Sequence, residues 1–122
     1  MVEVICDTSF LIHLATNRIK NLDNLDVEIG QITFVVPQVV INELSVLEKK
    51  PEKKQDIQST RNCIKSFKII PIQGSFADKE LLDYVSKNRA IVATMDRELK
   101  KQIKILGSSI MSIHNDKIIL EN

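Results

Sequence analysis

The chain has 122 residues, of which 43% are hydrophobic and 27% are charged, and we expect residues 1–122 to form a single globular domain. Its net charge of +1 excludes binding of nucleic acid through overall charge, so such binding needs local basic patches. No apolar run approaches membrane-spanning length, no secretory signal is present, and Cys6 and Cys63 lack metal-type spacing, which predicts a cytoplasmic protein with reduced thiols.

Apolar runs alternate with helical patterns along the chain. The runs that favour buried strands are residues 2–6, 32–36, 67–72, 90–94 and 109–113. The segments that favour helices are residues 8–15, 19–26, 37–50, 52–66, 75–87 and 96–106. Pro37 suits the first position of its helix because proline has no N–H to leave unpaired, and Gly107 suits the end of the last helix.

This alternation predicts an α/β fold. Right-handed crossovers between successive strands produce a mostly parallel sheet with helices on both faces, here a three-layer α/β/α sandwich with four to five strands. Residues 114–122 are a candidate for a short additional strand.

Four carboxylates stand at positions where such a sheet binds ligands. Asp7 directly follows the first strand, and Asp96 follows the fourth. In an open parallel sheet, ligands bind beyond the carboxyl ends of the strands where the strand order reverses. If strands one and four are neighbours at that point, Asp7 and Asp96 face each other. Asp78 lies in the first turn of its helix, at the same edge, and Glu43 borders the sheet-facing stripe of another helix.

Each of these acids also has a purely structural explanation. Asp7 and Asp96 suit N-caps of the helices that follow them, Ser75 and Asp78 fit a capping box, and Glu43 resembles an ordinary half-exposed helical acid. Four carboxylates at one edge nevertheless repel each other, and helix dipoles offset only about 1 kcal/mol each. A divalent cation removes the repulsion. Hard cations such as Mg²⁺ prefer oxygen ligands, and the lack of a histidine or thiolate pair argues against zinc.

Four segments carry a family resemblance that covers nearly the whole chain. ICDTSFLIHL, PQVVINELSVL, SFADKELLDYVSKN and AIVATMDRELKKQIKILGSSIMSI resemble, in order and spacing, the motifs of PIN-domain nucleases. The last segment is most similar to the branch that processes ribosomal RNA in archaea and eukaryotes, and to VapC-type toxins. The resemblance implies an endoribonuclease with one or two Mg²⁺ or Mn²⁺ ions, whose catalytic and metal-binding acids are Asp7, Glu43, Asp78 and Asp96.

The resemblance also implies supporting residues. The hydroxyl positions of the family fall on Thr8 or Ser9 and on Thr94, and Glu98 is the candidate for a further acid. Ser9 stands where many members carry asparagine. Ser9 and Thr94 either orient a ligand or cap the local backbone, and the sequence favours neither role. His13 and His114 are expected to be structural or exposed.

Two basic groups are candidates for contact with RNA. The first comprises Lys49, Lys50, Lys53, Lys54 and Arg61, and the second comprises Arg97, Lys100, Lys101 and Lys104. We interpret the first group as a solvated helical face, because acids are interleaved with it. Arg97 is better placed, since it adjoins Asp96. Aromatic residues are few, so no extended surface for base stacking is expected.

Alternative functions remain open. A phospho-receiver module needs an aspartate after the middle strand, and the third strand segment, KIIPIQG, supplies none. A catalytically inactive PIN-like scaffold that binds RNA or protein fits the same sequence. A toxin would have an antitoxin as its partner, a ribosomal RNA-processing enzyme would have a ribosome-assembly partner, and a homodimer is compatible with either.

Overall fold

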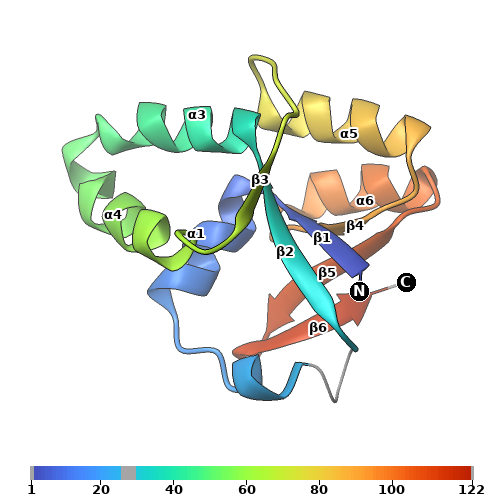
Figure 1. Cartoon of the computed structure of the whole chain (residues 1–122), viewed down its shortest axis with the longest axis horizontal. Coiled ribbons are helices and arrows are strands. Elements are labelled where there is room, and N and C mark those ends of the chain that lie inside the picture. The colour runs from blue at the N-terminus through green and yellow to red at the C-terminus, as the bar shows by residue number, and fades with distance from the viewer. Residues whose placement is uncertain (1, 26–29, 122) are drawn as a thin grey trace.

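The computed structural model describes residues 2–25 and 30–121, which form one six-stranded sheet with helices on both faces (Figure 1). The strands are β1 (Val2–Cys6), β2 (Ile32–Pro37), β3 (Lys68–Ile70), β4 (Ile91–Ala93), β5 (Ser109–His114) and β6 (Lys117–Glu121). Their order across the sheet is β3-β2-β1-β4-β5-β6, and all neighbours are parallel except β5 and β6. The mostly parallel sandwich expected from the sequence is therefore confirmed.

The strand number differs from the expected four to five because the C-terminal segment adds β6. Asn115 and Asp116 have φ values of 52° and 60°, which form a tight two-residue turn between antiparallel strands. Asn21 holds β6 from the other side, because its side chain accepts a hydrogen bond from the Ile118 N–H and donates one to the Ile118 carbonyl.

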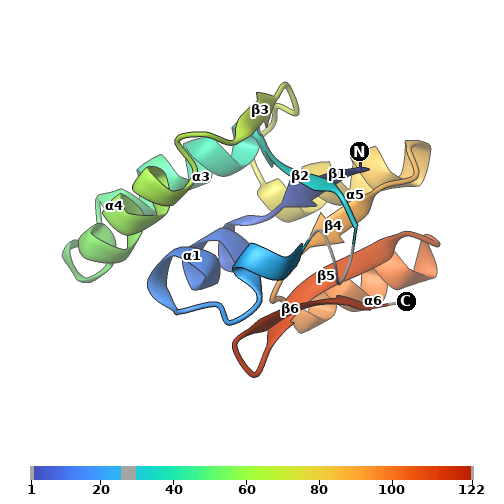
Figure 2. The same ribbon diagram turned by 60° about the horizontal axis from the view of Figure 1, so that its bottom comes forward.

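The described α-helices are α1 (Thr8–Thr16), α3 (Gln38–Glu48), α4 (Lys54–Cys63), α5 (Ala77–Lys87) and α6 (Arg97–Ile105). Figures 1 and 2 show α1, α3 and α4 on one side of the sheet and α5 and α6 on the other. Alternate strand residues point to opposite faces. Cys6 thus joins the core with α1, α3 and α4, and Ile5 joins the core with α5 and α6. None of the described helices is long and apolar enough to cross a membrane.

Several element boundaries differ from those expected. Pro37 ends β2 instead of starting a helix, because its ψ of 144° keeps the backbone extended and it pairs with Ile70 of β3. The helix expected over 52–66 divides into a short 3₁₀ turn, η2 (Pro51–Lys53), and α4. Of the helix expected over 19–26, the described part contains the 3₁₀ turn η1 (Leu22–Asn24) and the helical residue Leu25, and residue 26 lies outside the described residues.

The strand order places the reversal point between β1 and β4. The chain proceeds from β1 outward through β2 and β3, then continues on the other side of β1 with β4 and β5. The Asp7 N–H donates to the Ala93 carbonyl at 3.0 Å, which extends the β1–β4 ladder just beyond both strands. β3 lies at the sheet edge, whereas the third strand of a receiver module lies in the middle of its sheet, so the strand order also excludes that fold.

Candidate active site

Asp7 is a buried aspartate, 3% exposed, at the junction of β1 and α1. Its Oδ1 accepts hydrogen bonds from the Phe10 N–H at 2.8 Å and from the Ser9 hydroxyl at 2.9 Å. Its Oδ2 accepts a hydrogen bond from the Thr94 hydroxyl. The bond from Phe10 is an N-cap, so the capping explanation holds for one oxygen. The contact with Thr94 is not a cap, because it joins Asp7 to the end of the neighbouring strand β4.

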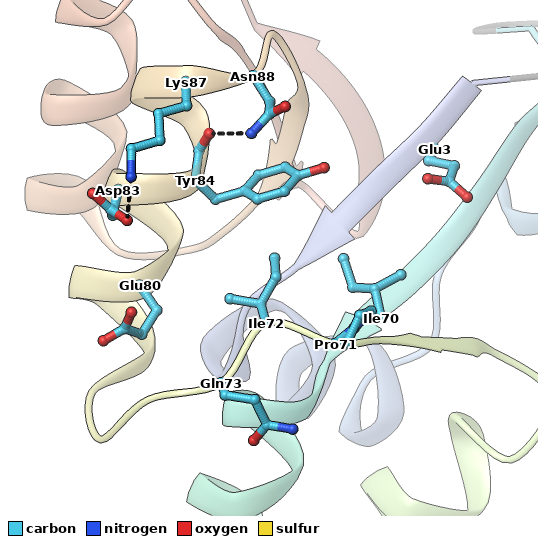
Figure 3. Close-up of a pocket in the computed structure, with 10 residues that line it drawn as sticks. All are labelled: Glu3, Ile70, Pro71, Ile72, Gln73, Glu80, Asp83, Tyr84, Lys87 and Asn88. Atoms are coloured by element: carbon cyan, nitrogen blue, oxygen red, sulfur yellow. Dashed lines mark hydrogen bonds and ion pairs between the residues drawn. The ribbon is translucent and has the colours of Figure 1, made fainter.

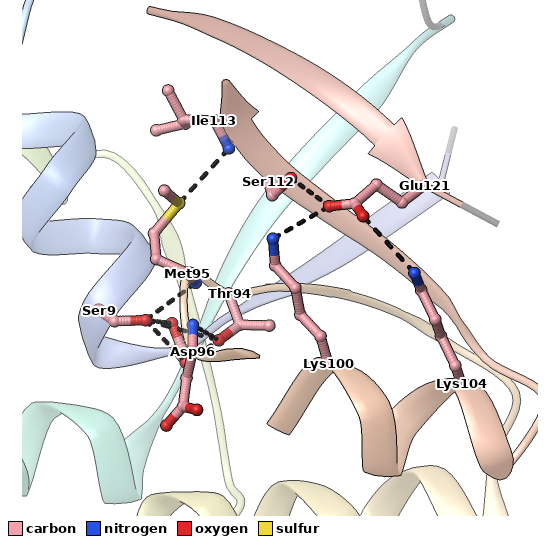
Figure 4. Close-up of polar contacts among 10 residues, drawn as sticks. Ser9, Thr94, Met95, Asp96, Lys100, Lys104, Ser112, Ile113 and Glu121 are labelled. Carbon is pink, nitrogen blue, oxygen red and sulfur yellow. Dashed lines mark hydrogen bonds and ion pairs between the residues drawn. The ribbon is translucent and has the colours of Figure 1, made fainter. Parts of the chain in front are cut away.

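Ser9 and Thr94 bind the segment after β4 to the carboxylate of Asp7. The Ser9 hydroxyl accepts a hydrogen bond from the Met95 N–H at 3.0 Å, and the Thr94 hydroxyl accepts one from the Asp96 N–H at 3.0 Å (Figure 4). A hydroxyl has a single hydrogen to donate, and in both residues it is directed to Asp7. Both side chains therefore hold Asp7 and the backbone before α6 in one geometry.

Thr8 stands outside this network. It is 8% exposed, and its hydroxyl has no hydrogen-bond partner among the residues that the structure describes. Of the two hydroxyls expected after β1, Ser9 is thus the one in contact with Asp7.

The charge of Asp7 has no cationic partner among the residues that the structure describes. Burial raises the pKa of Asp7 from 3.8 to about 6, against the opposing effect of hydrogen bonds from Thr94, Phe10 and Ser9. The negative charge of Asp78 raises this pKa further. Within residues 2–25 and 30–121, neither Asp7 nor Asp78 forms an ion pair with lysine or arginine.

Asp78 is the acid that interacts electrostatically with the other three candidate acids. Asp96 caps α6, since its Oδ1 accepts from the Glu98 and Leu99 N–H groups, and Figure 4 shows its carboxylate directed away from Ser9 and Thr94. Partial desolvation raises the pKa of Asp78, and the charges of Asp96 and Glu43 raise it further. The capping box expected for Asp78 is absent, because α5 begins after Phe76 and has no side-chain cap. Asp7, Glu43 and Asp96 thus all lie within electrostatic range of Asp78.

The raised pKa of Asp7 predicts how the stability of the metal-free protein depends on pH. Between about pH 4 and pH 6 the folded state keeps this proton and the unfolded state releases it, so the free energy of unfolding falls as pH rises through that window. The shift from 3.8 to about 6 corresponds to roughly 3 kcal/mol at pH 7. Denaturant unfolding in EDTA at several pH values, with wild type and Asp7→Asn, isolates this contribution. A stability difference between the two proteins that is constant from pH 4 to 7 would contradict it.

The donor set suits a hard divalent cation. The four acids offer only oxygen ligands, and the carboxylate of Asp7 is buried with no counter-charge from the described residues. In the described part of the chain, no group of three or more His, Cys, Asp or Glu side chains is close enough to hold a metal ion by itself. This arrangement is compatible with Mg²⁺, which keeps several waters and needs only one or two carboxylates.

The candidate supporting residues on α6 differ in their surroundings. Arg97 and Glu98 are exposed in its first turn, next to Asp96. Lys100 and Lys104 instead reach back to Glu121 of β6, at 3.0 and 3.5 Å (Figure 4). Two of the candidate lysines for RNA contact are therefore paired with Glu121, an acid outside the four candidates.

Glu121 is held in place by more than the lysines. The Ser112 hydroxyl donates to its carboxylate, and this bond, with Lys100 and Lys104, keeps the pKa of Glu121 below its usual range. In the first basic group the four lysines are exposed, and Arg61 pairs with Glu48 at 3.2 Å.

A groove of about 510 Å³ lies between the segment after β3 and α5. Figure 3 shows the Tyr84 ring reaching toward Ile70 and Ile72. None of the four acids lines it, so the candidate site is an electrostatic cluster at the sheet edge and not this groove.

Comparison with known proteins shows which family the chain belongs to. A family model described as a PIN-like domain matches residues 4–115. Ribonuclease VapC4 of Methanocaldococcus jannaschii is 29% identical over 129 residues, which cover 96% of this chain and 94% of that protein. The solved structure of the PIN domain endonuclease Utp24 has a TM-score of 0.75 and 25% identity, and the match covers 98% of this chain and 90% of that one. These matches confirm the resemblance seen in the sequence, and the chain belongs to the PIN-domain nuclease family.

Proposed function

We propose that this chain is an endoribonuclease that hydrolyses RNA phosphodiester bonds and depends on Mg²⁺ or Mn²⁺. The observation that carries the proposal is the buried carboxylate of Asp7, which lacks a cationic partner among the described residues and lies within the field of Asp78. The names of the relatives VapC4, a ribonuclease, and Utp24, an endonuclease, support the same class of reaction.

The proposed roles of the site residues follow from their positions. Asp7 and Asp96, at the ends of β1 and β4, are the proposed direct ligands, and Glu43 and Asp78 bind directly or through waters. When bound, the divalent ion lowers the pKa of an attacking water and stabilises charge on the phosphate oxygens. Glu98, exposed beside Asp96, is the proposed further acid.

Three side chains support the ligands without being ligands themselves. Ser9 and Thr94 orient the carboxylate of Asp7 and keep it ionised, because hydrogen bonds to a carboxylate favour its charged form. Arg97 is exposed, next to Asp96, and has no ion-pair partner in residues 2–25 and 30–121. Its planar guanidinium suits a phosphate of the bound RNA.

Cleavage of an end-labelled RNA, assayed with Mg²⁺, Mn²⁺ or EDTA, tests the proposal directly. We expect internal cleavage products with either ion and none in EDTA, with activity restored when the ion is added in excess. Cleavage that is equal in EDTA would refute the metal dependence. RNA binding without cleavage under every ionic condition would favour the alternative of an inactive PIN-like scaffold.

We propose that the activity is cytoplasmic and serves one of two biological roles. A toxin of the VapC type would arrest growth when expressed, and a co-expressed antitoxin would relieve the arrest. An enzyme of ribosomal RNA processing would act with a ribosome-assembly partner, and its loss would cause precursor RNA to accumulate. Either role is compatible with a homodimer, which sedimentation of the purified protein would reveal.

A further inference from the structure

Phe76 is an exposed aromatic residue whose position the core does not explain. Its side chain is 70% exposed, at the N-cap of α5, where it makes no capping hydrogen bond. The other phenylalanines pack together: the rings of Phe10 and Phe34 are 5.9 Å apart, and those of Phe34 and Phe67 are 5.4 Å apart. Phe76 is therefore the one phenylalanine of the sequence that is left outside the core.

Phe76 stands at the rim of the acidic site. It precedes Asp78 by two residues, so their Cα atoms are at most about 7 Å apart. Asp78 is the acid whose pKa responds to Asp96 and Glu43. Figures 1 and 2 show that α5 begins beside the start of α3, the helix that carries Glu43. The Val39 N–H of α3 donates to the Ile72 carbonyl at 2.9 Å and so anchors the segment that leads to Phe76.

The backbone before Phe76 is held in one shape. Gly74 has a φ of +144°, and a Cβ at this position would lie 2.3 Å from the Glu80 carboxylate. The side chain of Glu80 thus covers Gly74, and the Glu80 N–H donates to the Phe76 carbonyl at 3.1 Å. Phe76 consequently projects from a fixed loop and not from a free end.

A flat, small occupant fits Phe76 better than a folded partner. A protein interface of standard size covers about 800 Å² on each side and contains several apolar anchors. The structure describes every residue of α5, and none of them is an exposed large apolar residue. A nucleobase needs only one ring face, and aromatic side chains stack on every type of base.

We propose that Phe76 stacks on an unpaired base of the RNA, beside the phosphate bound at the acidic site. This inference rests on the proposed function. Stacking adds affinity that the surface charge supplies only weakly, since the net charge is +1 and Lys100 and Lys104 are paired with Glu121. A base inside a duplex is stacked on its neighbours and does not present a free face to Phe76.

The test is cleavage of a labelled single-stranded RNA by wild type, Phe76→Ala, Phe76→Leu and Phe76→Trp. We expect KM to rise about five- to fiftyfold in the alanine and leucine variants, with kcat nearly unchanged, and to stay near the wild-type value in the tryptophan variant. Ile105→Ala is the matched control, because Ile105 is an apolar residue 84% exposed at the far end of α6. Melting temperatures verify that all variants fold, as expected for exposed positions.

The tryptophan variant also reports binding without cleavage. The chain has no other tryptophan, so the fluorescence of Phe76→Trp belongs to this position alone. We expect single-stranded RNA to quench it and a duplex of the same sequence to leave it unchanged. A wild-type KM in Phe76→Ala, or in Phe76→Leu, refutes stacking, as does unchanged fluorescence when RNA binds. Failure of the proposed function would be distinguishable from failure of the stacking proposal, because the wild type would then cleave no RNA. In that case the quenching experiment alone would decide the role of Phe76.

Discussion

Asp7→Asn is expected to lower RNA cleavage more than about a hundredfold, beyond the range usual for residues that only support a ligand. The reason is that asparagine retains a carbonyl oxygen for the Phe10 N–H but loses the negative charge that attracts a divalent cation. The measurement is kcat/KM for a single-stranded RNA at saturating Mn²⁺. Retention of wild-type activity at the same metal concentration would overturn the assignment of Asp7.

The same variant is expected to be at least as stable as wild type. In EDTA at pH 7.5, the ionised Asp7 carboxylate is buried, with no counter-charge in residues 2–25 and 30–121. Its removal raises the free energy of unfolding by about 1 to 2 kcal/mol. Addition of Mg²⁺ should raise the melting temperature of wild type and not that of Asp7→Asn. Asp56→Asn, at an exposed position on α4, is the matched control and should change neither property.

Thr94→Val is expected to move the rising limb of the pH–rate profile to higher pH. The hydroxyl of Thr94 is the strongest of the hydrogen bonds that lower the pKa of Asp7. A hydrogen bond to a charged group contributes about 1.5 to 3 kcal/mol, so its loss raises this pKa by roughly one to two units. More of Asp7 is then protonated near neutral pH, where the proton competes with the metal ion. Activity should fall about three- to twenty-fivefold at pH 6.5 and recover in part at pH 8.5.

Thr60→Val is the control that distinguishes a shift of the pH–rate profile from the general effect of removing a buried hydroxyl. Thr60 is fully buried in α4, and its hydroxyl donates to the Asp56 carbonyl at 2.8 Å, with no contact to the four acids. This variant should lose stability and keep the wild-type pH profile. If Thr94→Val reduced activity by the same factor at every pH, its hydroxyl would not act through the ionisation of Asp7.

The positions of the acids were predictable because they depend on local patterns. A β-branched run that ends in Asp7, and another that ends shortly before Asp96, identify two strand ends without any knowledge of the sheet. The condition that these two strands are neighbours is met, because β1 pairs with β4. Helix ends were less predictable: the Ser75 capping box does not form, since the backbone before α5 is shaped instead by Gly74 and Glu80.

The partners of these side chains were not predictable in the same way. Ser9 and Thr94 each had two plausible roles in the sequence, and the contact that unites them with Asp7 joins residues 85 and 87 positions apart. The pairing of Lys100 and Lys104 with Glu121 requires β6, which was only a candidate additional strand over residues 114–122 and whose partners on α6 the sequence does not indicate. Nothing in the sequence distinguishes Phe76 from a core aromatic residue, and its exposure depends on the loop before α5.

The sequence by itself determined the alternation of strands and helices, the four candidate acids and the family, because hydrophobic periodicity and the motif spacing are properties of neighbouring residues. Only the tertiary structure decided which side chains meet: the hydroxyls that hold Asp7, the acid that neutralises two lysines, and the aromatic ring left at the rim. The reason is physical. Burial and hydrogen bonding between distant segments depend on the strand order β3-β2-β1-β4-β5-β6, and no single segment encodes that order.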